Sequence, residues 1–587
     1  MKQFFKFTFA SILGFFVSIF ILMFIFFMIT FALASSLSTV ETVSIYENTI
    51  LELHLNYEVP ERSNYEPLVN FSIFPSMGKT LGLNDIKRII THAKYDYNIE
   101  GIYLNLDDFY VGGLSKINSI REALIDFKTS NKFIIAHGNR ISEKAYYLAT
   151  VADSIFLTPT GTMEFDGFGI EVSFFKKALD KLEIEPQIFQ HGKYKSATEP
   201  FKLDKLSNEN KEQLSGYLNS VYNNYLSKIS ESTTLEKTVL NDVASKLKIR
   251  SAEDSEKFGL VHSLKYKDEV DSIMYGYMDP TMKIEKINAK KYFYSMNGNN
   301  TYSKNRIAVI YALGEIVNGT GDEYSIGTKN IINSIKKARD NNRIKAIVMR
   351  VNSPGGSPLT SDMIWREIEI VSKEKPFIVS MGDIAASGGY YISCNADKIV
   401  AEPNTLAGSI GVYGIIPNTN VFFENKLGIT FDRVETGDNS SLITITTPLS
   451  KTQKLYIQKQ IDDIYHDFVT RVSDGRNLSY EEIDKIANGR IWSGIEAKNI
   501  GLVDTLGGLD LALKIAANNA GIENYKIVEY PAQKEAFEKI FELFKGKIGT
   551  SYTEIFSEYP LNQINKLKEA LKYTGIQTRL PFEYEIY

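Results

Sequence analysis

The fold of this chain is decided by residues 377–392, which read FIVSMGDIAASGGYYI. An apolar run ends there in small residues, one serine and two glycines, and a helical pattern then resumes. This order is typical of a strand that turns sharply into a helix, a junction that presents one side chain beside backbone N–H groups. We therefore take Ser387 as the candidate nucleophile.

A second glycine turn lies upstream at residues 351–357, VNSPGGS. Glycines let the backbone approach a ligand closely, and such a turn can offer an N–H group to an oxyanion. Ser353, Ser357 and Ser409 also stand near glycines. Each is a weaker candidate nucleophile than Ser387.

The composition excludes several classes of protein. The 587 residues, 44% apolar and 23% charged, are typical of a folded chain with two or more domains. A net charge of -5 argues against a nucleic-acid partner. The single cysteine, Cys394, and six histidines without metal-ligand spacing predict no disulfide, no metal and no cofactor.

The N-terminal segment predicts a membrane anchor in residues 1–40. No charged residue occurs between residues 7 and 40, and about 20 apolar residues suffice to cross a bilayer. Lys2 and Lys6 precede the run, which by the positive-inside rule keeps the N-terminus in the cytoplasm. The alternative is a cleaved signal peptide with its small-residue site at 32–34, ALA.

The body of the chain repeats itself. A strand, an amphipathic helix and a strand are predicted at 50–55, 85–94 and 101–106, and again at 306–311, 330–339 and 345–351. Tyr-Tyr and Ala-Asp pairs recur at a constant spacing (390 − 146 = 397 − 153 = 244). Such spacing indicates a duplicated domain, and alternating strands and helices indicate an α/β fold.

The repeat divides the chain into segments. We assign residues 41–278 to a first half, 279–305 to a linker, 306–516 to a second half and 517–587 to a C-terminal helical extension. In that extension, apolar residues at helix spacing predict one amphipathic face: Phe537, Ile540, Phe541 and Phe544. We expect this face to dock against the body or a neighbouring subunit, with a membrane-lying or substrate-lining face as the alternative.

The two halves complement each other chemically. The position equivalent to Ser387 in the first half is Glu143 (387 − 244 = 143), so the first half has no nucleophile turn. It carries instead a lysine motif, HGKYKSATEP at 191–200, whose counterpart near 435–440 contains no lysine. A hydroxyl nucleophile needs a base, and a lysine can act as one when burial keeps it neutral. One composite site with a Ser–Lys dyad is therefore predicted, with Lys193 and Lys195 as the candidate bases.

These motifs together resemble one known family. Residues 352–356 (NSPGG), 380–390 (SMGDIAASGGY), 408–414 (GSIGVYG) and 194–201 (YKSATEPF) are similar to the long, duplicated form of signal peptide peptidase A, also called protease IV. The resemblance spans about residues 50–516. It implies a tandem ClpP/crotonase-like fold, with Ser387 as nucleophile, Lys195 as general base, and the N–H groups of Gly388 and Gly356 as the oxyanion hole.

The resemblance also implies a biological setting. It predicts a serine endopeptidase in the inner, or cytoplasmic, membrane, with its catalytic part on the periplasmic side. Its substrates would be cleaved signal peptides and other membrane-associated peptides, and its assembly a homotetramer. Two alternatives stay open: a crotonase-type acyl-CoA hydratase or hydrolase that uses Glu143, and a non-catalytic membrane scaffold.

Overall fold

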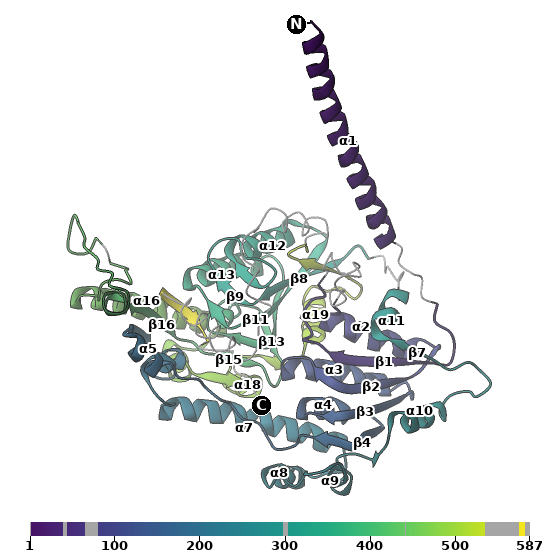
Figure 1. Cartoon of the computed structure of the whole chain (residues 1–587). Helices are drawn as coiled ribbons and strands as arrows, with labels where there is room; N and C mark the ends of the chain where they lie inside the picture. Colours follow the sequence, from purple (N-terminus) through teal and green to yellow (C-terminus); the bar gives the residue numbers. More distant parts are fainter. Residues whose placement is uncertain are drawn as a thin grey trace.

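The computed structural model of the protein describes residues 2–38, 44–64, 80–296, 303–440, 442–533 and 575–580. Helix α1, Lys2–Ser38, projects away from the body of the molecule (Figure 1). Within the described residues it is the one helix long and apolar enough to cross a membrane, over Lys6–Phe26. The apolar helix predicted at the N-terminus is therefore present.

The first half is built on a six-stranded parallel sheet in the order β6-β4-β3-β2-β1-β7. Its strands are β1 Thr49–Asn56, β2 Ile99–Tyr110, β3 Phe133–Ile141, β4 Ser154–Met163, β6 Ser263–Leu264 and β7 Glu285–Asn288. Helix α2, Leu83–Tyr95, buries Ile86, Ile89 and Ile90 completely, as the helical spacing of these residues predicts. The remaining helices are α3 Leu114–Lys128, α4 Glu143–Ala149, α5 Lys176–Leu182, α6 Glu199–Lys202, α7 Asn208–Ser232, α8 Lys237–Ser245, α9 Ala252–Lys257, α10 Lys267–Tyr275 and α11 Ala289–Ser295.

The second half repeats this plan. Its sheet runs β19-β8-β11-β13, with β15 and β17 continuing from the end of β13, and β14 and β18 beside the start of β13. The strands are β8 Arg306–Leu313, β11 Ile344–Ser353, β13 Phe377–Ala386, β14 Lys398–Ala401, β15 Leu406–Gly408, β17 Ile491–Ser493, β18 Thr505–Leu506 and β19 Lys526–Tyr530. The helices are α12 Thr328–Asp340, α13 Pro358–Ser372, α14 Gly388–Tyr391, α15 Asn420–Phe422, α16 Lys451–Arg476, α17 Tyr480–Ile486, α18 Gly494–Asn499 and α19 Leu509–Asn519. The predicted duplication of an α/β unit is thereby confirmed.

The edges of the two halves differ from the predicted boundaries. Strand β7 lies within the expected linker and pairs with β1 of the first half. Strand β19 lies within the expected helical extension and pairs with β8 of the second half. Both halves therefore end in an equivalent edge strand beyond the limit drawn from the sequence. The described part of the extension beyond α19 contains strands rather than helix, and the predicted apolar face at 537–544 lies outside the described residues.

A third sheet joins the two halves, in the order β10-β9-β12-β20-β16-β5. Its strands are β5 Glu185–His191, β9 Glu315–Val317, β10 Ser325–Gly327, β12 Gly355–Gly356, β16 Val412–Asn418 and β20 Gly575–Arg579. Strand β5 comes from the first half and pairs antiparallel with β16 of the second along the whole of both strands. The segment that follows β5, with the lysine motif, is thereby carried to the second half.

Candidate functional site

Ser387 stands at the junction between β13 and α14, where the sequence predicted a sharp turn. Its backbone has φ 55 and ψ −118, a conformation that a residue with a side chain rarely adopts. The Ser387 N–H donates to the carbonyl oxygen of Gly408 at 2.8 Å, which helps to hold the turn. Strained backbone of this kind is found where a nucleophile is presented at the end of a strand.

Lys195 meets Ser387 across the contact between the halves. The Nζ atom of Lys195 lies 2.8 Å from Ser387 Oγ, and both side chains are fully buried. Desolvation by this burial lowers the pKa of the Lys195 ammonium well below its ordinary range. Lys193, the other candidate base, is exposed, with its Nζ over the ring of Tyr194. The structure therefore places Lys195, and not Lys193, beside the serine.

The second half also holds the backbone around Lys195 through a hydrogen bond and close packing. The Tyr194 N–H donates to the carbonyl oxygen of Asn488 at 2.9 Å. Gly489, at φ +81, lies so close to this backbone that a Cβ atom on it would stand 2.5 Å from the backbone nitrogen of Lys195. From α7, Gln213 donates to the Tyr194 carbonyl oxygen at 3.0 Å and accepts from the Ile491 N–H at 3.2 Å. The lysine is thus fixed by contacts with both halves.

Ser409 is a further member of the site, and the sequence reasoning assigned it no role except as a weak candidate nucleophile. Lys195 Nζ lies 3.0 Å from both the Oγ atom and the carbonyl oxygen of Ser409. Ser409 has φ 51 and directly follows β15, which pairs with the end of β13. The GSIG motif at 408–411 was a signal for a turn, but nothing in it shows that the turn faces a lysine.

The glycine turn at the end of β11 lies against Ser387, as predicted. A Cβ atom on Gly355, which has φ +101, would stand 2.7 Å from Gly388 N and 3.0 Å from Ser387 Cβ. The Gly355 N–H already donates to Ser353 Oγ at 3.2 Å. This bond occupies the Gly355 N–H, whereas Gly356 lies opposite Thr578 in the antiparallel pair of β12 and β20. Ser357 caps α13 by accepting from the Thr360 N–H.

In the first half, the residue equivalent to Ser387 has a different environment. Glu143 accepts hydrogen bonds from the N–H groups of Asp166 and Gly167, at 3.1 and 2.9 Å. Desolvation raises the pKa of Glu143 to about 7. The carboxylate is held by a loop of its own half and is not among the groups around Lys195.

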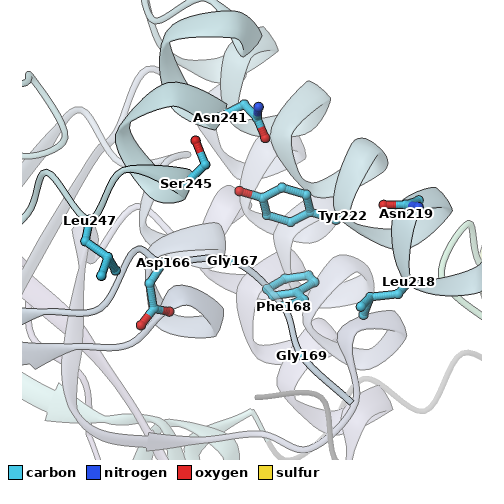
Figure 2. A pocket seen from close by; sticks show the side chains of 10 residues that line it. All are labelled: Asp166, Gly167, Phe168, Gly169, Leu218, Asn219, Tyr222, Asn241, Ser245 and Leu247. Carbon is cyan, nitrogen blue, oxygen red and sulfur yellow. The ribbon is translucent and has the colours of Figure 1, made fainter. Parts of the chain in front are cut away.

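A cavity of about 550 Å³ lies next to this loop, and Figure 2 shows its lining. The rings of Phe168 and Tyr222 pack edge to face in its wall, with centroids 5.3 Å apart. Neither Ser387 nor Lys195 lines it. The cavity therefore does not belong to the composite site.

Comparison with known proteins agrees with the geometry. The sequence profile of peptidase family S49 matches residues 126–275 and 369–523, once in each half. Protease 4 of Haemophilus influenzae is 36% identical over 74% of this chain and 72% of its own length. Protease 4 of Salmonella typhi is 35% identical over 79% of this chain and 76% of its own.

A plant relative, the chloroplastic serine protease SPPA of Arabidopsis thaliana, is 31% identical over 75% of this chain and 66% of its own length. Among solved structures, a ClpP1 mutant from Listeria monocytogenes aligns weakly, with 18% identity and a TM-score of 0.24 over 35% of this chain and 94% of its own. Two profile matches and long alignments to named proteases lead to one conclusion: this chain belongs to peptidase family S49, in its long, duplicated form.

Proposed function

We propose that this protein is a membrane-anchored serine endopeptidase in which Ser387 is the nucleophile and Lys195 the general base. One observation carries the proposal: two fully buried side chains from different halves, a hydroxyl and a lysine, lie 2.8 Å apart beside a glycine turn. Membership of a peptidase family supports the same reading.

The hydrogen bonds around Lys195 fit a neutral amine. A neutral amine donates two hydrogen bonds and accepts one. Lys195 has three oxygen neighbours: Ser387 Oγ, Ser409 Oγ and the Ser409 carbonyl oxygen. When Nζ donates to the two Ser409 oxygens, its lone pair is left to accept the Ser387 O–H. That is the arrangement in which a base can take the proton.

Catalysis then follows in two stages. Lys195 takes the Ser387 proton while Oγ attacks the peptide carbonyl carbon, and the N–H groups of Gly388 and Gly356 stabilise the oxyanion. Lys195 passes its proton to the leaving amine as the C–N bond breaks. In the second stage Lys195 takes a proton from water, which attacks the acyl-enzyme. The bond between the acyl carbon and Ser387 Oγ breaks, Lys195 returns its proton to Oγ, and the acid product leaves.

The proposed location and substrates rest on α1. The one membrane-length apolar helix found in the described part of the chain, with Lys2 and Lys6 at its start, supports an anchor in the inner membrane, with the body on the periplasmic side. A site tethered to that surface suits apolar peptides that remain in the membrane, such as cleaved signal peptides. The homotetramer implied by the family resemblance stays a prediction, which the mass of the detergent-solubilised protein tests.

A serine-directed fluorophosphonate probe tests the chemistry. We expect the probe to label Ser387 in the wild type and to leave the Ser387→Ala protein unlabelled, with peptidase activity reduced by about 10³-fold or more. Lys195→Ala should be as damaging, whereas Lys193→Ala, its matched control, should stay near wild type. Wild-type activity in the Ser387→Ala protein would refute the nucleophile assignment, and the reverse order of the two lysines would move the base to Lys193.

A further inference from the structure

Strand β20, from near the C-terminal end of the chain, lies between two strands of the second half. On one side it pairs antiparallel with β16, Tyr413 opposite Gln577 and Ile415 opposite Gly575. On the other side it pairs antiparallel with β12, Gly355 opposite Arg579 and Gly356 opposite Thr578. In Figure 1 it is the yellow strand beside β16. An extended segment therefore lies directly over the glycine turn of the site.

The register of β20 brings the carbonyl oxygen of Thr578 against Gly355, on the side of that glycine that faces Ser387. The point where a Gly355 Cβ atom would stand is 2.1 Å from the Thr578 carbonyl oxygen, 2.7 Å from Gly388 N and 3.0 Å from Ser387 Cβ. The next residues continue past the site, since the Leu580 N–H donates to the Pro354 carbonyl oxygen at 2.7 Å. A peptide bond, Thr578–Arg579, thus crosses the site where a substrate bond would lie.

The side chains of the last two residues of β20, and of Leu580 after it, are buried or paired with neighbouring residues. Thr578 is fully buried, and its hydroxyl donates to the Gly356 carbonyl oxygen at 3.0 Å. A Cβ atom on Gly388 would stand within 3.1 Å of Thr578 Oγ1, Ile316 Cδ1 and Ser361 Oγ, so the pocket for Thr578 is small. Arg579 pairs with Glu315 of β9 at 3.1 Å, and Leu580 is only 1% exposed.

We propose that β20 occupies the peptide-binding groove of the enzyme, so that the chain's own C-terminal segment competes with substrate. The proposal rests on the function proposed above and specifies its substrate. A peptide adds as a strand between β12 and β16, with a small residue such as Thr before the cleaved bond. A basic residue facing Glu315 follows that bond, and then an apolar residue.

Peptide binding to a chain that cannot catalyse tests this occupancy. The probe is a fluorescein-labelled GIQTRL peptide, the sequence of residues 575–580, added to full-length Ser387→Ala protein. Thr578→Arg should expel β20, because the pocket around Gly388 has no room for the longer side chain. A tethered segment competes at an effective concentration of about a millimolar, so we expect its removal to tighten binding by at least about tenfold. Thr238→Arg, on the exposed face of α8, is the matched control and should leave the Kd unchanged.

Fluorescence polarisation of the peptide gives the answer. Equal affinity with and without Thr578→Arg, or no binding to either protein, would overturn the proposal. This readout does not depend on catalysis. If the peptide binds as expected but proteins that retain Ser387, the wild type and the Thr578→Arg single variant, do not react with fluorophosphonate, the proposed chemistry fails and the groove assignment stands.

A charge exchange tests the side-chain assignment in the same Ser387→Ala, Thr578→Arg protein. The peptide GIQTRL should bind about 3- to 10-fold more tightly than GIQTEL, because a partly buried ion pair with Glu315 is lost in the second peptide. Glu315→Lys should reverse that order. A merely structural Glu315 would weaken both peptides alike, and that outcome would contradict the assignment.

Discussion

Lys195 is a buried lysine whose oxygen neighbours in the site are neutral. Desolvation is the cause of its lowered pKa, and no carboxylate among the described residues compensates for the lost water. Burying a charged ammonium would destabilise the fold, and a neutral amine costs less to bury. The neutral amine is also the form that can accept a proton. In the proposed mechanism, burial of this residue therefore serves the chemistry as well as the packing.

The pH dependence of activity follows from the direction of this shift. Below its lowered pKa Lys195 is protonated and cannot act as a base, and above that pKa it can. We expect kcat/KM to rise with pH through a midpoint well under the usual lysine value of 10.5. Lys195→Arg should be inactive at every pH, because arginine stays protonated. Lys193→Arg is the control, and a flat profile between pH 6 and 9 would contradict a lysine base.

Ser409 should act through Lys195 as a positioning residue. Ser409→Ala removes one of the two oxygens that orient Nζ, while alanine tolerates φ 51 about as poorly as serine does. One hydrogen bond of about 0.5–1.5 kcal/mol predicts a fall of about 2- to 10-fold in kcat, with KM unchanged. Steady-state kinetics measure both constants, with exposed Ser440→Ala as control. A change confined to KM would assign Ser409 to substrate binding instead.

At the scale of elements, the site depends on how strands of the two halves are held together. Strand β11, which ends in the glycine turn, carries Arg350, and Arg350 Nε lies 2.9 Å from Glu61 Oε2 of the first half. Both side chains are almost wholly buried. Burial is the largest single influence and opposes the ionisation of Glu61, but Arg350 together with Lys116 and Lys87 outweighs it and holds the pKa of Glu61 below its ordinary value. The pair therefore fixes the charged form of both groups.

Breaking this ion pair should destabilise the contact between the halves. Glu61→Gln takes from the buried Arg350 guanidinium its hydrogen-bonded counter-charge and leaves only the more indirect attraction of Glu402 and Asp383. Such a loss costs about 3–5 kcal/mol. We expect a clearly lower Tm and faster urea unfolding. Asp463→Asn breaks an exposed pair with Lys459 and should cost under about 0.5 kcal/mol. Equal effects of the two substitutions would show that the buried pair contributes no more than a surface one.

Because the Glu61 pKa is lowered, the stability it contributes should also depend on pH. This contribution is present above the unfolded carboxyl pKa of about 4.3 and is lost as pH falls through the lowered folded value. Thermal unfolding between pH 3 and 7 should therefore show a steeper acid loss in wild type than in the Glu61→Gln protein.

For the whole molecule, the duplication has produced two halves with separate contributions to one site. The first half supplies Lys195, and the second supplies Ser387, Ser409 and both glycine turns. Further hydrogen bonds join the two halves. Glu402 of the second half, for example, accepts hydrogen bonds from Asn118 and Ser119 of the first. A complete site therefore forms within one folded chain.

Mixing two inactive full-length proteins tests this arrangement. If the site forms within one chain, Lys195→Ala and Ser387→Ala proteins combined in equal amounts should stay as inactive as either alone. Fluorophosphonate labelling and peptidase rates measure the outcome after the mixture is unfolded and refolded together. Recovery of about a quarter of wild-type activity per site would show instead that the halves exchange between chains.

The sequence located some helices and strands and misplaced the ends of both halves, because it carries only local patterns. Local spacing located α2 and the strands that precede Ser387, because one amphipathic period suffices to identify each. It ended both halves too early, since β7 and β19 are short edge strands whose partners, β1 and β8, lie more than 200 residues away in the chain (285 − 49 = 236; 526 − 306 = 220). Their pairing leaves no local signature.

By itself, the sequence determined the duplicated α/β plan, the apolar N-terminal segment and the turn that presents Ser387. Each depends on patterns over a few residues or on the constant spacing between copies. The family resemblance implied Lys195, but only the tertiary structure placed Lys195, and not Lys193, beside Ser387. Only the tertiary structure also brought Ser409 to the amine and placed β20 over the glycine turn. These depend on contacts between residues 192 to 222 positions apart in the chain, and desolvation of the lysine arises only when the halves close around it.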